Sequence, residues 1–146
     1  MNILTIFAHS DDAEIWAGGT IIKHSKRGDN VSICTFIESG SLRIAEANAG
    51  AELLGAKINI IDRKILFNRE LLVIELEKMI QEFLPSIIIT HWNDDTHYEH
   101  RLVQDIVMQA IISPKITTSY PRILLSCDTF NSLGVRKMFS PNFLSI

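Results

Sequence analysis

The chain has 146 residues, of which 47% are hydrophobic and 21% charged, and its formal net charge at pH 7 is −3. This composition predicts one globular domain with a core of its own and excludes a disordered chain, a coiled coil and a disulfide scaffold. The mild acidity, without clustered Lys and Arg, argues against nucleic acid or an anionic membrane surface as a partner. Cys34 and Cys127 lie in apolar runs, which favours buried thiols in a reducing compartment. Without an export signal or a membrane-spanning stretch in the sequence, we expect a cytoplasmic protein.

Short apolar runs alternate along the chain with segments in which apolar residues recur at helical spacing. In chain order, we expect a strand at residues 2–8, a helix at 18–28, a strand at 31–36, a helix at 41–54, a strand at 58–61, a helix at 68–83, a strand at 86–90, a helix at 99–112 and a strand at 122–126. Gly28 and Gly55 are expected to cap the first two helices, and Pro85 follows the third.

This alternation predicts parallel β-α-β units, because continuously apolar strands are typical of sheets covered on both faces. We therefore expect an α/β protein, a three-layer sandwich with a Rossmann-like, mostly parallel five-stranded sheet in the order 3-2-1-4-5, formed by a single domain over residues 1–146. In that order the first and fourth strands are neighbours, and the winding of the sheet reverses between them. Ligands of such sheets bind at this point, beyond the carboxyl ends of the strands. The residues that follow Ala8 and Thr90 are therefore the expected site.

Four of the five histidines lie in the two segments that follow these strands. A catalytic divalent metal needs about three protein ligands and an open position, and imidazole with carboxylate suits zinc. The first segment offers His9 with Asp11 or Asp12, and the second offers His97 and His100 at the start of a helix. Two adjacent aspartates cannot both ligate, so one would bind the metal and the other would act as base towards a water whose pKa is lowered to about 7. The remaining histidine would donate a proton or stabilise an oxyanion.

Each of these residues also has an ordinary structural explanation when it is considered alone. His9 could be a hydrogen-bonded polar residue at a strand end, and Asp11 or Asp12 could cap the following helix. His97 and His100 could be capping and surface residues. Their occurrence together, at two strand ends that flank one crevice, favours a shared site.

Two motifs around these residues resemble the signatures of the PIG-L/LmbE-like family of metal-dependent N-acetylglucosaminyl deacetylases. The first signature is a strand ending in Ala-His-Pro-Asp-Asp, followed by an acidic residue and Gly-Gly-Thr, and residues 8–20 read AHSDDAEIWAGGT. The second is Asp-x-His-x-Asp-His with a following Arg, and residues 95–103 read DTHYEHRLV. Between them, Arg43 and Glu46 resemble the family's Arg-x-x-Glu helix. The resemblance covers almost the whole chain.

The resemblance implies a role for each residue of the two motifs. His9, Asp12 and His100 would be the metal ligands, and the metal would be Zn²⁺ or another divalent ion such as Fe²⁺. Asp11 would be the general base, and His97 would protonate the leaving amine or support the tetrahedral intermediate. The reaction would cleave the acetamide of an N-acetylglucosamine-type sugar conjugate into acetate and a free amine.

The resemblance also implies the partner of the protein and the way in which it would be held. Arg43 would contact the substrate, which would be a small amino-sugar conjugate. We expect no nucleic-acid partner and no membrane insertion, and a homo-oligomer is compatible with the pattern.

The sequence departs from the family pattern at three places. Ser10 replaces the usual proline, and Glu99 replaces the usual aspartate before the ligand histidine, which lengthens a carboxylate that could orient a ring. Family members usually continue beyond the point that corresponds to residue 146, so we expect this chain to lack their C-terminal segment. The alternative function is therefore a shortened relative that binds metal with weak or no catalysis and acts as a binding protein or subunit.

A phosphoacceptor signalling domain is the competing interpretation from another functional class. An acid pair after the first strand, Asp62 after the third and Thr90 after the fourth would fit it. That fold also needs a lysine at the end of the fifth strand, where residues 126–128 read SCD. It gives the histidines no role, and we therefore favour the hydrolase.

Overall fold

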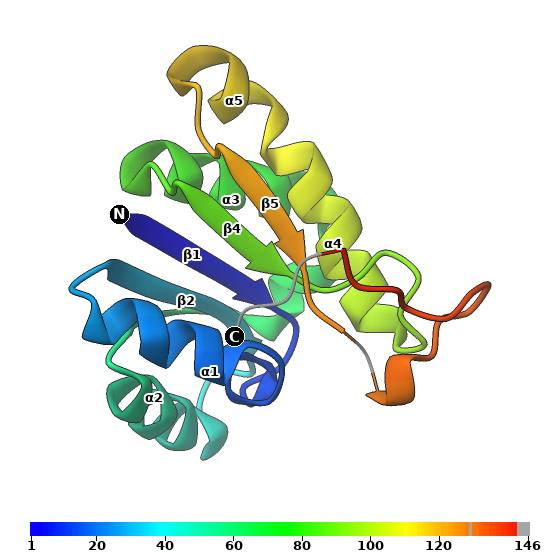
Figure 1. Ribbon diagram of the computed structural model, residues 1–146, viewed down its shortest axis with the longest axis horizontal. Helices are drawn as coiled ribbons and strands as arrows, with labels where there is room; N and C mark the ends of the chain where they lie inside the picture. The colour runs from blue at the N-terminus through cyan, green and yellow to red at the C-terminus, as the bar shows by residue number, and fades with distance from the viewer. Residues whose placement is uncertain (129, 143–146) are drawn as a thin grey trace.

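A computed structural model describes residues 1–128 and 130–142 of the chain as an α/β sandwich (Figure 1). In chain order its elements are β1 (Asn2–Phe7), α1 (Asp12–Lys26), β2 (Asn30–Ile37), α2 (Arg43–Leu54), β3 (Lys57–Asp62), the 3-10 helix η1 (Arg63–Phe67), α3 (Arg69–Phe83), β4 (Ile87–Thr90), α4 (Tyr98–Ala110), α5 (Ile112–Thr118), β5 (Ile123–Ser126) and the short 3-10 helix η2 (Phe130–Ser132). The five strands are parallel and lie in the order β3-β2-β1-β4-β5. The predicted fold class and strand order are confirmed.

Two apolar clusters fix the helices on opposite faces of the sheet. Side chains alternate along β1, so that Leu4 and Ile6 face one cluster while Ile3 and Phe7 face the other. The first cluster includes buried apolar residues of α3 and α4, and the second includes buried apolar residues of α1 and α2. Because both faces are covered, the strands are mostly apolar, and their carboxyl ends form an open polar edge between the two helical layers.

The pairing of β1 with β4 creates the crevice that the strand order predicts. Ile3 pairs with Ile87 and Ile6 with Thr90, so the two strands end side by side. The segment after β1 runs directly into α1, and the segment after β4 runs into α4. Residues that are distant in the sequence therefore meet at one edge of the sheet, as expected.

The helices differ from the expected ones in two main respects. The first helix begins at Asp12 instead of residue 18, because Ala13, Ala17 and Ile21 form a continuous buried stripe that the glycine pair inside the helix obscures in the sequence. The helix expected to end at residue 112 ends at Ala110, and α5 follows it separately. The first turn of α5 contains Pro114, which is tolerated there because backbone N–H groups in the first turn of a helix have no intrahelical hydrogen-bond partner. Gly55 ends α2 in the left-handed region at φ 67°, as predicted.

The segment after β5 folds back over the loop between β4 and α4. The buried carboxylate of Asp94 accepts hydrogen bonds from the backbone N–H groups of Arg136 and Lys137, each at 3.0 Å, and from Nε of Arg136 at 2.8 Å. Gly134 forms a bridge with Asp95 in the same place. This segment therefore holds the loop from its outer side. Residues 143–146 lie outside the described residues.

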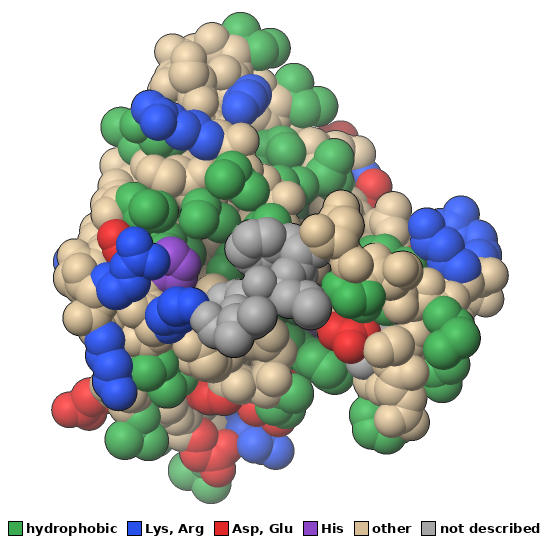
Figure 2. Space-filling view, in the orientation of Figure 1, with side chains coloured by type: hydrophobic (Ala, Val, Ile, Leu, Met, Phe, Trp, Pro, Cys, Tyr) green, Lys and Arg blue, Asp and Glu red, His purple; other side chains and the backbone are tan. Residues whose placement is uncertain are grey.

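The surface carries mixed charge in the view of Figure 2. Lys and Arg side chains occur there in several separate places among hydrophobic and acidic ones. No helix in the described part of the chain combines the length and apolar character needed to cross a membrane.

Replacing Gly134 by alanine is expected to destabilise the protein. An added Cβ would lie 2.4 Å from the carbonyl oxygen of Lys137, 2.5 Å from the indole ring of Trp92 and 2.7 Å from the carbonyl oxygen of Asp94. We expect the free energy of unfolding, measured by urea denaturation, to fall by about 1–3 kcal/mol.

Gly19→Ala is the matched control for this substitution. A Cβ at Gly19 would meet nothing within 4 Å, and the residue lies inside α1. Alanine is therefore expected to stabilise the helix by about 0.5–1 kcal/mol. Equal losses of stability in the two variants would contradict the close approach at Gly134.

Candidate active site

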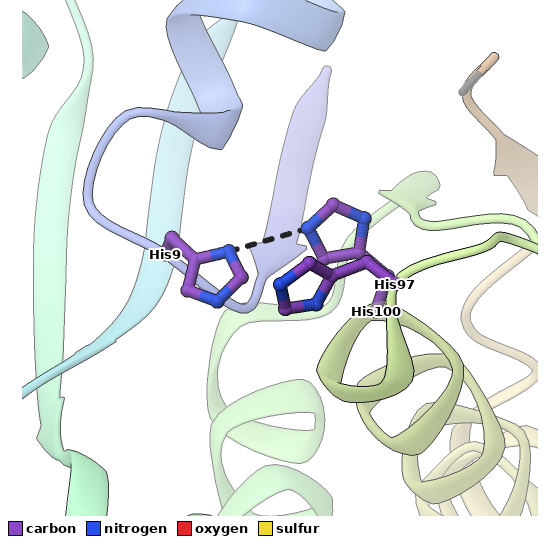
Figure 3. A group of neighbouring side chains, drawn as sticks. All are labelled: His9, His97 and His100. Atoms are coloured by element: carbon purple, nitrogen blue, oxygen red, sulfur yellow. Dashed lines mark hydrogen bonds between the residues drawn. The ribbon is translucent and has the colours of Figure 1, made fainter. Parts of the chain in front are cut away.

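Four histidines converge at the carboxyl ends of β1 and β4. His9 follows β1 and His91 follows β4, whereas His97 and His100 come from the start of α4. Figure 3 shows the ring of His9 facing those of His97 and His100. Nδ1 of His9 lies 3.2 Å from Nε2 of His100, and the ring centroids of His91 and His100 are stacked 3.8 Å apart. The prediction that the two loops meet is therefore confirmed.

The carboxylate of Asp12 lies at the centre of this group. It is 3.2 Å from Nδ1 of His9, 3.3 Å from Nε2 of His91 and 3.5 Å from Nε2 of His100. It also accepts the backbone N–H of His9 at 2.8 Å, which turns the chain sharply at the end of β1. Burial alone would raise the pKa of Asp12, but its contacts with the imidazole nitrogens of His100, His9 and His91 outweigh this effect and hold the pKa well below its usual range.

Two further carboxylates orient the histidine rings from behind. Nε2 of His9 donates to Glu99 at 2.7 Å, and Nδ1 of His100 donates to Asp95 at 2.8 Å. Asp95 also accepts the backbone N–H of His97 at 2.8 Å, so it organises the start of α4. Each ring therefore presents its other nitrogen to Asp12 and to the opposite ring. A carboxylate behind a histidine is the usual partner of an imidazole that binds a metal.

The spacing of these donor atoms fits a divalent ion. The facing nitrogens of His9 and His100 lie 3.2 Å apart, Oδ2 of Asp12 lies 3.2 Å from Nδ1 of His9, and Oδ1 of Asp12 lies 3.5 Å from Nε2 of His100. A tetrahedral ion with metal–nitrogen bonds of about 2.1 Å requires about 3.4 Å between its ligand atoms. Two imidazoles and one carboxylate are also a donor set that zinc or iron accepts. This His/Asp cluster can therefore hold a metal ion.

Proximity alone admits other ligand sets, which all share His100. Donor atoms within 4.8 Å of one another occur in the group His9, His97 and His100 and in the group Asp12, His91 and His100. Nε2 of His91 accepts the backbone N–H of Ala8 at 2.9 Å, so its lone pair is already engaged. A ligand set that uses His91 would have to displace this hydrogen bond.

The protonation preferences of the cluster follow from its carboxylates. Burial lowers the pKa of His100, but hydrogen bonds and charges from Asp12 and Asp95 outweigh this effect and raise it to about 9. Burial lowers the pKa of His91, and the nearby carboxylate of Asp12 only partly opposes this shift. A positive charge between Asp12, Asp95 and the rings is therefore favoured, whether a proton or a metal ion carries it.

The other two predicted site residues lie beside this cluster. Asp11 is exposed at the N-terminus of α1, and its side chain makes no capping hydrogen bond. Asp11, His9 and Arg43 line the same cavity of about 420 Å³. The side chain of Arg43 is 63% exposed and bonded to Glu46 at 3.0 Å. The structure therefore brings every predicted site residue to one region, with Arg43 at its outer wall.

Sequence reasoning misses three contributors to this region. His91 counts among the histidines of the two segments but has no predicted role, and its stacking on His100 and its contact with Asp12 become visible only in the fold. Asp95 lies inside the second motif, yet its contact with His100 becomes visible only in the fold. Arg63, which bonds Glu99, has no signal in the sequence. Asp62, which the phosphoacceptor interpretation uses, instead caps η1 by accepting the N–H of Lys64.

Solved structures of similar fold include enzymes of different reactions. The 4-carboxy-2-hydroxymuconate hydratase from Pseudomonas putida is 24% identical with a TM-score of 0.67, and the match covers 76% of this chain and 55% of that one. A conserved protein from Thermus thermophilus is 17% identical with a TM-score of 0.77, covering 97% and 69%. The N,N'-diacetylchitobiose deacetylase from Pyrococcus horikoshii is 23% identical with a TM-score of 0.65, covering 75% and 49%. The chain thus spans about half the length of the hydratase and of the deacetylase.

A family model provides the more specific match. The model described as PIG-L, GlcNAc-PI de-N-acetylase, matches residues 4–111, which include both motifs and all the histidines of the cluster. The matched range is well over half of the sequence. The chain therefore belongs to the PIG-L family.

Proposed function

We propose that this protein is a metal-dependent hydrolase that removes the acetyl group from an N-acetylglucosamine-type sugar conjugate and releases acetate and a free amine. The observation that carries the proposal is the convergence of His9, Asp12 and His100, in which the nearest donor atoms of each pair of residues lie 3.2 to 3.5 Å apart. Membership of the PIG-L family supports the acetamide as the bond to be cleaved. The fold shared with a deacetylase of diacetylchitobiose is consistent with it.

His9, Asp12 and His100 would hold the ion, and Zn²⁺ or Fe²⁺ suits this donor set. When bound, the ion would supply Lewis acidity, which activates water and polarises the acetamide carbonyl. Glu99 and Asp95 would keep both imidazoles in the ligating orientation.

Asp11 is proposed as the general base. Its carboxylate is exposed, lines the cavity next to His9 and makes no capping hydrogen bond. It can therefore accept the proton of the attacking water as the C–O bond forms. Asp12 cannot take this role, since His9, His91 and His100 already surround its oxygens.

His97 is proposed to act on the other side of the reacting carbon. Its ring is exposed and lies edge-on to His9 and against His100, with centroid distances of 4.8 and 4.5 Å. From there it would donate a hydrogen bond to the developing oxyanion or a proton to the leaving amine. Cleavage of the C–N bond, with that proton transferred to the leaving nitrogen, would release the free amino sugar.

Arg43 is proposed to contact the sugar conjugate beyond the acetamide. It lines the cavity of about 420 Å³ together with His9 and Asp11. Its exposed guanidinium can exchange the surface pairing with Glu46 for a substrate oxygen at little cost, because such pairs contribute only about 0.2–0.5 kcal/mol.

Metal content tests the ligand set. Purified protein is expected to bind about one Zn²⁺ per chain, and His9→Ala, Asp12→Ala or His100→Ala should each abolish tight binding. His97→Ala should retain the ion, which separates this set from the group of three histidines. The readout is metal content after dialysis against a weak chelator.

His24→Ala is the control for these variants. His24 lies on α1 with its ring bonded to Asp29 at 2.7 Å, outside the cluster. The His24→Ala variant should bind zinc as the unaltered chain does. Loss of zinc in His97→Ala with retention in Asp12→Ala would contradict the proposed set.

Acetate release tests the reaction. Release from a panel of N-acetylglucosamine conjugates should be detectable, and it should stop with a strong chelator and return with Zn²⁺. Asp11→Asn should lower kcat by about 100- to 10,000-fold while zinc remains bound, because only the base is removed. Full zinc occupancy without acetate release from any substrate would instead favour the metal-binding relative with weak or no catalysis.

A further inference from the structure

We propose that Arg63 is a positioning residue that fixes the ring of His9 through Glu99 and thereby sets the affinity of the cluster for its metal ion. This inference rests on the proposed metal site. Arg63 lies outside both motifs and opens η1, directly after β3. Its guanidinium reaches Glu99, the residue that holds His9. Three segments far apart in the sequence are thus joined in one chain of contacts.

The starting point of Arg63 is itself fixed by local contacts. Asp62, the last residue of β3, accepts the backbone N–H of Lys64 at 2.8 Å and the hydroxyl of Ser39. These contacts pin the first turn of η1 to the carboxyl end of β3 and to the loop after β2. The side chain of Arg63 therefore extends along the same polar edge of the sheet that carries His9.

Glu99 uses its two carboxylate oxygens for two different partners. Oε1 accepts Nη2 of Arg63, and Oε2 accepts Nε2 of His9 at 2.7 Å. The side chain of Glu99 is only 12% exposed. A glutamate has three rotatable side-chain bonds, and a partner on each oxygen restricts them to one arrangement. Arg63 thus supplies the second restraint, without which the carboxylate can turn away from His9.

The orientation of His9 decides which nitrogen faces the ion. With Nε2 bound to Glu99, Nδ1 lies 3.2 Å from both Asp12 and His100. Thr35 fixes the backbone of the same residue by donating its hydroxyl to the carbonyl oxygen of His9 at 2.7 Å. The backbone is held from β2, so the remaining freedom of His9 is the rotation of its ring. Glu99 controls that rotation, and Arg63 controls Glu99.

An ordinary surface ion pair is the competing explanation, and the chain contains a matched example. Arg63 and Arg69 each have a side chain that is 41% exposed, and both pair with a carboxylate of α4. Arg69 contacts Asp105 at 2.6 Å and Gln109 at 3.1 Å, both on the outer part of α4. If Arg63 formed only a surface ion pair, replacing Arg63 and replacing Arg69 would change the zinc affinity by the same amount.

The test compares zinc affinity in the full chain, measured by competition with a chromophoric chelator. Glu99→Gln should weaken zinc binding by about 10- to 100-fold, as is usual for partners behind a ligating histidine. Arg63→Met should weaken it by about 10-fold, and Arg69→Met by less than about twofold. Arg63→Lys, which keeps the charge but not the planar fork, should restore part of the affinity.

The double variant Arg63→Met with Glu99→Gln separates positioning from a general effect of charge. If Arg63 acts through Glu99, the double variant should bind zinc within about twofold of Glu99→Gln alone. Additive losses would overturn the proposal, and so would equal affinities of Arg63→Met and Arg69→Met. Urea denaturation of each variant checks that a weakened affinity does not reflect unfolding.

The outcome for this inference is distinguishable from that for the proposed function. Zinc binding with the predicted pattern but without acetate release would end the deacetylase proposal and leave the role of Arg63 standing. Acetate release with an Arg63→Met variant that binds zinc like Arg69→Met would do the reverse. An unaltered chain that binds no zinc would overturn both.

Discussion

Backbone hydrogen bonds between β1 and β4 place two strand ends side by side, and the arrangement of the site depends on this pairing. Ile6 lies opposite Thr90, so the next residues of each strand emerge at the same edge. The two cores hold the strands rigidly, while the edge itself stays polar. His9 and His100, which are 91 positions apart, come within 3.2 Å because of it. A one-residue slip in this register would turn the site residues to opposite faces.

The second constraint is electrostatic. Asp12, Asp95 and Glu99 each contact at least one imidazole, and all three are largely removed from water. Carboxylates in such surroundings are stable only with a compensating positive charge or several hydrogen bonds. The three carboxylates therefore favour a positive charge at this point of the fold. The geometry and the charge of the cluster both favour a bound cation at this place.

The sequence predicted those features that depend on local pattern. The strand order, the cap at Gly55 and the meeting of His9 with His100 follow from alternation, from glycine and from topology. The early start of α1 escaped because its buried stripe consists largely of alanine, whose small side chain gives a weak periodic signal. The contact of Arg63 with Glu99 escaped because it joins residues 36 positions apart that share no pattern. Such pairings are products of packing and become visible only in three dimensions.

The hydrogen bonds that Asp94 accepts from Arg136 and Lys137 bear on where the domain of this chain ends. The matched family range stops at residue 111, yet the buried carboxylate of Asp94 receives its hydrogen bonds from Arg136 and Lys137. A polypeptide cut at residue 111 would leave that carboxylate without these donors, next to the aspartate that orients His100. The residues after β5 therefore support the loop that carries part of the site. A domain boundary placed at residue 111, where the family match ends, would exclude these supporting residues.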